Sequence, residues 1–187
     1  GPSVSSFKRV LDKAGFVNHR TRTQSPPSLR LENRMPAEKA NDVWSVDFKG
    51  WWFTKEKERC EPLTIRDEYS RFILCLSVPK TSVKSEFERI FEMYGLPRTM
   101  RSDNGQPFAC TRAPLGLSRL SAWWVALGID LDRIEPGHPE QNGAHERMHR
   151  DIKMELQGVI EGGIREHQHI FDLWREEFNW ERPHEAL

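Results

Sequence analysis

The pattern of apolar and polar residues along the chain predicts a series of short strands. Trp44, Val46 and Phe48 alternate with Ser45 and Asp47, which is typical of a strand with one apolar and one polar face. A later segment is apolar almost throughout, as expected of a strand that is covered on both faces. The segments expected to form strands are 43–52, 60–65, 72–78, 98–103 and 129–134.

Apolar residues at helical spacing predict helices in the same region. Val83, Phe87 and Ile90 follow Thr81 and Ser82, either of which is a good N-cap, and Gly95 ends their helix. The expected helices are 83–94, 118–127, 140–156 and 164–179. The first strands follow one another closely, and the later strands alternate with helices. The pattern therefore indicates an α/β domain in which helices pack against a mixed sheet.

The chain divides into a short lead-in and one main domain. Gly1 and Pro2 are typical of the remnant of a cleaved tag and are set aside. The segment 3–23 contains a short amphipathic helix, and 24–40 carries three prolines without a sustained period, which is typical of a linker. The main domain is expected over 41–187.

Composition narrows the class of protein. The chain has 187 residues, of which 37% are hydrophobic, enough for one ordinary domain with a real core. Its 28 Lys and Arg balance 28 Asp and Glu, so the net charge gives no nucleic-acid signature, although residues 1–34 carry a local balance of about +5. The cysteines form no Cys-x-x-Cys pair, which argues against a thiolate zinc site. No apolar run approaches the ~18 residues of a membrane span, and an intracellular protein is expected.

Two aspartates lie at strand positions where a ligand could gather. Asp47 is on the polar face of the first strand, a rigid element. Asp103 ends the strand over 98–103, and ligands of open α/β sheets gather at the carboxyl ends of strands. Asp103 also precedes Asn104 and Gly105, so an ordinary turn is the alternative interpretation.

The helix expected over 140–156 has one apolar and one polar face. Ala144, Met148 and Ile152 fall in one arc at about 100° per residue. The residues of the opposite arc are Glu146, His149, Arg150 and Lys153. This arc offers a carboxylate with cations one and two turns away, or it is an ordinary solvated face.

The same helix contains a zinc-protease motif as a competing interpretation. His145, Glu146 and His149 match H-E-x-x-H, in which two histidines bind zinc and the glutamate acts as a base. This interpretation leaves Asp47 and Asp103 without a role. His145 lies about 100° around the helix from Glu146, so the two side chains are not expected to face the same site.

Ordered motifs along the main domain resemble a known family. The motifs are WSVDFKG, YGLPRTMRSDNGQPF, GLSRLSAWWVALGI, PGHPEQNGAHERMHR and NWERPHEAL. Together they resemble the integrase-core transposases of bacterial insertion sequences, relatives of retroviral integrases with a ribonuclease-H-like fold. The resemblance covers 41–187 almost continuously, and 3–23 resembles more weakly the end of a helix-turn-helix DNA-binding region. It implies a mixed sheet flanked by helices, preceded by a short helix and a linker.

The resemblance implies a DDE triad of Asp47, Asp103 and Glu146 that is both catalytic and metal-binding. Such a triad holds two Mg²⁺ (or Mn²⁺) ions when DNA is bound. The implied activity is DNA strand cleavage followed by strand transfer, in which a 3′-hydroxyl attacks target DNA without a covalent enzyme intermediate. The 42 residues between Asp103 and Glu146 exceed the gap in retroviral integrases, and the excess is expected in a loop over 110–117.

The resemblance also implies DNA as the partner, both element ends and target DNA, with self-association in a DNA-bound synaptic complex. A cytoplasmic, nucleoid-associated location follows. Arg150 and Lys153 are expected to hold DNA phosphates. The other residues expected to contact DNA are Asn104, His138, Asn142 and His149. A catalytically idle DNA-binding module of the same fold is the alternative, although all three carboxylates are present.

Overall fold

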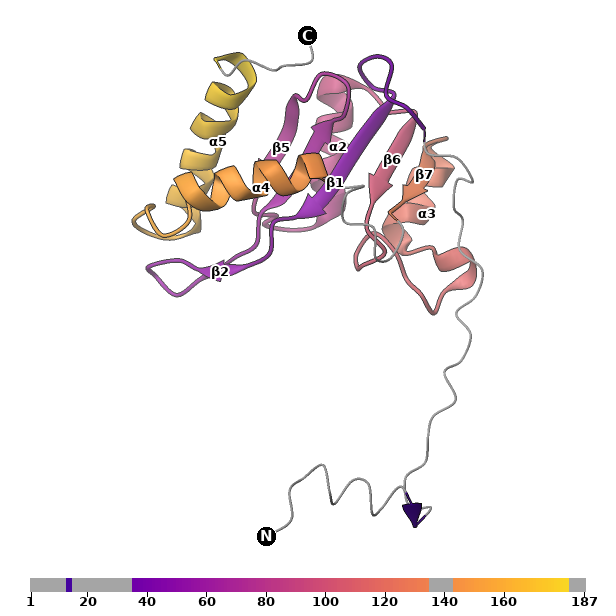
Figure 1. Cartoon of the computed structure of the whole chain (residues 1–187), viewed down its shortest axis with the longest axis horizontal. Coiled ribbons are helices and arrows are strands. Elements are labelled where there is room, and N and C mark those ends of the chain that lie inside the picture. Colours follow the sequence, from indigo (N-terminus) through magenta and orange to yellow (C-terminus); the bar gives the residue numbers. More distant parts are fainter. Residues whose placement is uncertain (1–12, 15–34, 135–142, 182–187) are drawn as a thin grey trace.

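The computed structural model describes residues 13–14, 35–134 and 143–181 (Figure 1). Nearly all of the helix expected over 3–14 and most of the linker expected over 24–40 lie outside these ranges. The strands are β1 (Val43–Phe48), β2 (Trp52–Phe53), β3 (Arg59–Cys60), β4 (Leu63–Asp67), β5 (Ile73–Ser77), β6 (Thr99–Ser102) and β7 (Asp130–Arg133). The helices are α2 (Val83–Tyr94), α3 (Arg119–Ala126), α4 (Gly143–Glu155) and α5 (Ile164–Trp180).

The strand β1 stands at the centre of the main sheet. The strand order is β5-β4-β1-β6-β7, and β2 pairs with β3 in a separate hairpin. β1 is antiparallel to β4 and parallel to β6, and β7 is parallel to β6. The chain therefore forms the mixed sheet that the sequence predicts, a meander of β1, β4 and β5 followed by parallel strands reached through helices.

Two residues interrupt strands that the sequence predicts as continuous. The strand expected over 43–52 ends at Phe48, and Gly50 follows with a φ of 87°, a left-handed conformation that breaks an extended strand. The strand expected over 60–65 is divided into β3 and β4 at Pro62, which has no N–H to donate to a neighbouring strand. The loop expected over 110–117 contains one 3₁₀ turn, Pro114–Gly116.

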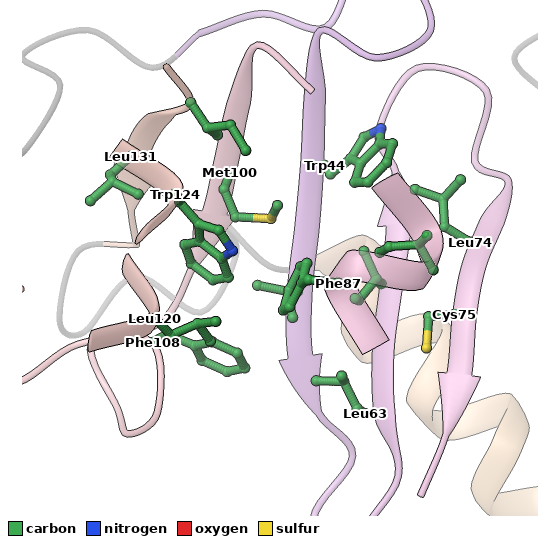
Figure 2. Close-up of a cluster of buried hydrophobic side chains, with 14 residues drawn as sticks. Trp44, Leu63, Leu74, Cys75, Phe87, Met100, Phe108, Leu120, Trp124 and Leu131 are labelled. Carbon is green, nitrogen blue, oxygen red and sulfur yellow. The ribbon is translucent and has the colours of Figure 1, made fainter. Parts of the chain in front are cut away.

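The helices α2 and α3 cover the apolar face of β1. Trp44 and Val46 of β1 pack with Phe87 of α2 and Trp124 of α3 (Figure 2). The ring centroids of Phe87 and Trp124 lie 4.9 Å apart with their planes at 70°, a favourable edge-to-face arrangement. The alternation of apolar residues in β1 therefore builds this half of the core, as the sequence predicts.

The helices α4 and α5 cover the opposite face of the sheet. Met148 and Ile152 of α4 and Phe171 of α5 pack with Ile73 and Leu76 of β5. Every residue of β5 is buried, which confirms the expectation of a strand covered on both faces. None of the described helices is both long and apolar enough to cross a membrane.

The cysteines lie inside or close to the core. Cys60 and Cys75 are buried, and Cys110 is half-buried. Burial raises the pKa of the Cys60 thiol to about 12 and that of the Cys75 thiol to about 11. These two thiols therefore stay protonated at neutral pH and pack as small apolar groups.

Replacing Trp124 by alanine tests the core between the sheet and α3. Trp124 is fully buried against Phe87 and Phe108, so its truncation should lower the free energy of unfolding by about 3–5 kcal/mol. A matched surface control is Met154→Ala, because Met154 is 74% exposed; its effect should stay below about 0.5 kcal/mol. Urea denaturation measures both variants, and equal losses would contradict this description of the core.

Candidate active site

Asp47 and Asp103 each follow the last paired residue of two neighbouring parallel strands. Val46 on β1 is paired with Ser102 on β6, and Asp47 and Asp103 are the next residues along the chain. Adjacent strands lie about 4.8 Å apart. Asp47 is half-buried and Asp103 is exposed. One carboxylate therefore stands at the carboxyl end of the pairing on each of the two strands.

Asp103 also shapes the turn that follows β6. The N–H of Gly105 donates to Asp103 Oδ1 at 3.0 Å. A Cβ atom at position 105 would lie 2.9 Å from Asp103 Oδ2, so glycine is the residue that lets the chain pass this close to the carboxylate. The side-chain amide of Asn104 donates to the carbonyl of Ile134 at 2.6 Å, which joins the ends of β6 and β7. The turn interpretation of Asp103 is confirmed, and the turn fixes the place of its carboxylate.

Arg133, the last residue of β7, is a site residue that sequence reasoning missed. Its Nη1 donates to Ser102 Oγ at 2.7 Å and to the backbone carbonyl of Asp103 at 3.4 Å. Burial lowers the pKa of the guanidinium to about 10, and the charge of Asp103 acts against this shift. Arg133 therefore stays charged at neutral pH beside Asp103. In the sequence, Arg133 follows Ile129, Asp130, Leu131 and Asp132 and stands where this alternation has its apolar residues; the sequence analysis gave it no role in the site.

The helix α4 carries two histidines against the polar face of β1 and β4. His145 is fully buried, with Nδ1 2.9 Å from Ser45 Oγ and Nε2 3.1 Å from Thr64 Oγ1. One turn later, His149 Nε2 lies 2.8 Å from the same Thr64 Oγ1. Thr64 Oγ1 also donates to the backbone carbonyl of Asp47 at 2.9 Å. A continuous set of polar contacts thus joins α4 to the strand that carries Asp47.

Both histidines are neutral at physiological pH. Burial is the main cause that lowers the pKa of His145 to about 3, and the charge of Arg66 adds to it. Burial likewise lowers the pKa of His149 to about 3, with smaller contributions from His145 and Lys49. Each ring therefore carries a single N–H, and its other nitrogen is an acceptor.

These contacts disfavour the zinc-protease interpretation of the H-E-x-x-H motif. Both ring nitrogens of His145 lie within hydrogen-bonding distance of hydroxyl groups, and so does Nε2 of His149. A zinc-binding histidine must instead direct one ring nitrogen at the metal. Glu146 is exposed whereas His145 is buried, so the two side chains point in different directions, as expected from their 100° separation.

The place of His149 on α4 differs from the one that the sequence predicts. Periodicity put His149 on the outward arc with Glu146, Arg150 and Lys153. Those three residues are exposed, but His149 is half-buried against Thr64, so that expectation is wrong. The reason is that periodicity counts imidazole as polar, whereas the strands beneath α4 offer a hydroxyl group that satisfies it.

The first turn of α4 lies over the centre of the sheet. Figure 1 shows α4 crossing the sheet, with its first turn at β1 and its last turn toward α5. His145 in that turn contacts Ser45, two residues before Asp47 on β1. Glu146 is the next residue, so the third predicted carboxylate lies at the end of α4 that is closest to β1.

Lys49 is a second residue near the site to which sequence reasoning gave no role. It follows Asp47 by two residues, and its backbone N–H donates to the carbonyl of Pro62 at 3.0 Å. The side chain is half-buried; burial lowers the pKa of its ammonium group, and the charge of Lys153 on α4 lowers it further. Lys49 and Lys153 are therefore neighbours. The alternation of the first strand already puts Lys49 on the face of Asp47, because residues i and i+2 of a strand share a face, but it does not show the nearby Lys153.

The three carboxylates offer suitable ligands for a hard cation but do not converge in this structure. Carboxylate oxygens without thiolates are the ligands that Mg²⁺ prefers. Within the described ranges, however, no three Asp, Glu, His or Cys side chains gather closely enough to hold one metal ion. Asp103 Oδ1 accepts a hydrogen bond from Gly105 instead. His138 and Asn142, which the sequence also singles out, lie outside the described residues.

Solved structures with the same arrangement are retroviral integrase cores. The catalytic core domain of HTLV-2 integrase, solved with magnesium in a dimeric form, matches with a TM-score of 0.55 and 13% identity, over 81% of this chain and 95% of that chain. The catalytic core domain of BIV integrase matches with a TM-score of 0.55 and 21% identity, over 77% of this chain and 87% of that one. The expected ribonuclease-H-like fold, a mixed sheet flanked by helices, is confirmed.

Relatives in sequence are proteins of insertion elements. An uncharacterized 31.7 kDa protein of insertion element IS407 from Burkholderia multivorans is 25% identical over 96% of this chain and 64% of that protein. An uncharacterized 39.2 kDa protein of IS476 from Xanthomonas euvesicatoria is 27% identical over 99% of this chain and 53% of that protein. The chain therefore spans between about half and two thirds of the length of these curated relatives.

Family models described as integrase core domain match two overlapping parts of the chain, residues 37–139 and 127–187. The first match covers more than half of the chain and contains Asp47 and Asp103, and the second contains Glu146. The resemblance carried by the sequence motifs is thereby confirmed: the chain belongs to the integrase core domain family.

Proposed function

We propose that this domain is the catalytic core of a DDE transposase, which cleaves DNA strands and joins a 3′-hydroxyl to target DNA in a metal-dependent reaction. One observation supports the proposal: Asp47 and Asp103 directly follow the paired residues Val46 and Ser102 of β1 and β6, and the first turn of α4, which carries Glu146, contacts β1 through His145. The insertion-element relatives and the HTLV-2 core solved with magnesium support it.

The three carboxylates are proposed to hold two Mg²⁺ or Mn²⁺ ions in the complex with DNA. The ions would stabilise the charge that develops on the attacking and leaving oxygens of a phosphodiester. The chain itself supplies the placement of the ligands. Pairing of β1 with β6 fixes the spacing of Asp47 and Asp103, and Arg133 anchors the backbone of Asp103 through its Nη1.

Three cations around the carboxylates are proposed to bind the DNA backbone. Arg150 and Lys153 are exposed on α4, and Lys49 is half-buried after the end of β1. Burial is the main cause of the lowered pKa of Lys49, and the charge of Lys153 adds to it, so a phosphate between the two lysines would relieve their repulsion. Such contacts position DNA without reading its sequence. Asn104, His138, Asn142 and His149 stay predicted as further contacts with DNA.

The active form is proposed to be a self-associated complex that contains element ends and target DNA. The HTLV-2 integrase core is solved in a dimeric form, which supports association of such domains. The proposed place of action is the nucleoid, because the substrate is DNA. The competing proposal, an idle DNA-binding module, differs in one measurable respect: it would bind DNA without cleaving it.

Removal of one carboxylate at a time tests the triad. Asp47→Asn, Asp103→Asn and Glu146→Gln should each lower Mg²⁺- or Mn²⁺-dependent cleavage and strand transfer at least about a hundredfold, because each loses a negatively charged ligand worth several kcal/mol in the transition state. The measurement is product formation by the full-length protein on labelled duplexes that carry candidate element ends.

Glu161→Gln is the matched control for these variants. Glu161 is exposed and pairs with Lys55 at 2.9 Å, so its loss should leave the rate within about twofold of the original. Near-normal cleavage by Asp103→Asn would overturn the triad. Binding without cleavage by the unmodified protein, with either metal, would favour the idle module.

Replacement of the proposed phosphate-binding cations tests the DNA contact. Lys49→Ala, Arg150→Ala and Lys153→Ala should each weaken binding to unrelated DNA sequences alike, and each should reduce the slope of log affinity against log salt by about one unit. Lys80→Ala, at an exposed position before α2, is the control and should leave the slope unchanged. Unchanged slopes for the three variants would mean that these cations do not meet DNA.

A further inference from the structure

We propose that the hydroxyl group of Thr64 is the junction that sets the position of α4 on the sheet, and that it thereby places Glu146 relative to Asp47 for metal binding. This inference deepens the proposed function and rests on it. Thr64 does not touch the reacting groups itself, so it is a positioning residue.

The Thr64 hydroxyl has three polar neighbours within hydrogen-bonding distance. They are the backbone carbonyl of Asp47 at 2.9 Å, His145 Nε2 at 3.1 Å and His149 Nε2 at 2.8 Å. A hydroxyl group offers one donor and two acceptor lone pairs. Three neighbours therefore use its full capacity, and Thr64 is fully buried, so water does not substitute for any of them.

The single proton of this hydroxyl sets the direction of both imidazole contacts. Because Thr64 donates its proton to the carbonyl of Asp47, Nε2 of each histidine must be the donor to Thr64 Oγ1. On its other side, Nδ1 of His145 lies 2.9 Å from Ser45 Oγ, so the ring is held between β1 and β4.

Two donors on successive helical turns that meet one oxygen resist both sliding and rotation of α4. His145 and His149 are four residues apart, so a slide of one turn would leave one of them without its partner. A rotation by one residue, about 100°, would turn both rings away from Thr64. The apolar contacts of Met148 and Ile152 are less directional and do not impose the same register.

This junction therefore connects two proposed metal ligands through two bonds. Thr64 holds the backbone carbonyl of Asp47, and it holds His145, the residue before Glu146. Partners of this kind, which orient ligands without contacting the metal, typically account for a factor of about 10 to 100 in metal affinity.

The test compares Thr64→Val, which keeps the shape and loses the hydroxyl, with Thr64→Ser, which keeps the hydroxyl. Mn²⁺ binding is measured by calorimetry on purified protein with bound DNA, and DNA affinity is measured without metal. Thr64→Val should weaken Mn²⁺ binding about tenfold or more and leave DNA affinity unchanged, whereas Thr64→Ser should stay within about threefold of the unmodified protein. If Thr64→Val does not fold, Mn²⁺ binding alone is compared between His149→Leu and His149→Gln, because glutamine retains an N–H donor to Thr64 whereas leucine does not; weaker Mn²⁺ binding by His149→Leu alone is expected, and equal binding would overturn the junction.

Nitrogen NMR of the histidine rings gives an independent readout. In the unmodified protein, Nε2 of both His145 and His149 should carry a proton, because each donates to Thr64 Oγ1. An Nε2 without a proton in either ring would overturn the proposed junction, and so would equal Mn²⁺ affinity of Thr64→Val and the unmodified protein. The Asp47→Asn variant distinguishes failure of the proposed function from failure of the positioning role of Thr64. If Asp47→Asn binds Mn²⁺ as well as the unmodified protein does, both the proposed function and the inference are wrong. If Asp47→Asn loses Mn²⁺ and Thr64→Val does not, the positioning role alone fails.

Discussion

The parallel pairing of β1 with β6 is the constraint on which the candidate site depends. It joins segments more than fifty residues apart and pairs Val46 with Ser102, the residues directly before Asp47 and Asp103. The pairing is held from the other face, where Trp44 and Val46 of β1 pack with Met100 of β6 beneath α2 and α3. One face of the central strands thus supplies the burial that stabilises the domain, and the other is left for polar side chains.

The helix α4 docks on that polar face through buried imidazole and hydroxyl groups as well as apolar contacts. Burial of such groups costs free energy unless their hydrogen bonds are satisfied. Here His145 lies between Ser45 and Thr64, and His149 lies against Thr64. Directional contacts limit the positions that α4 can take on the sheet, which suits the proposed role of this helix in presenting Glu146 to Asp47 and Asp103.

The sequence predicts the sheet and its helices where apolar periodicity and end signals agree. Ser82 and Gly95 bound α2 as expected, and the alternation in β1 assigns Asp47 to the polar face correctly. The sequence does not predict hydrogen-bonding or charged partners that come from distant segments of the chain. His149 looks like a surface residue until the hydroxyl on β4 is known. Arg133 is connected with the site by its contact with the backbone of Asp103, and Lys49 by the nearby charge of Lys153. Both contacts depend on the tertiary structure, so motif resemblance does not predict them.

The central claim is that Asp47, Asp103 and Glu146 form one metal site. Its most direct test is an anomalous difference map from crystals of the protein bound to a DNA end and soaked with Mn²⁺. The account predicts a strong peak between Asp47 and Asp103, within about 2.5 Å of an oxygen of each carboxylate, and a second peak nearby that includes Glu146. A strongest peak at the ring nitrogens of His145 and His149, or saturating Mn²⁺ with no peak at Asp47, would contradict it.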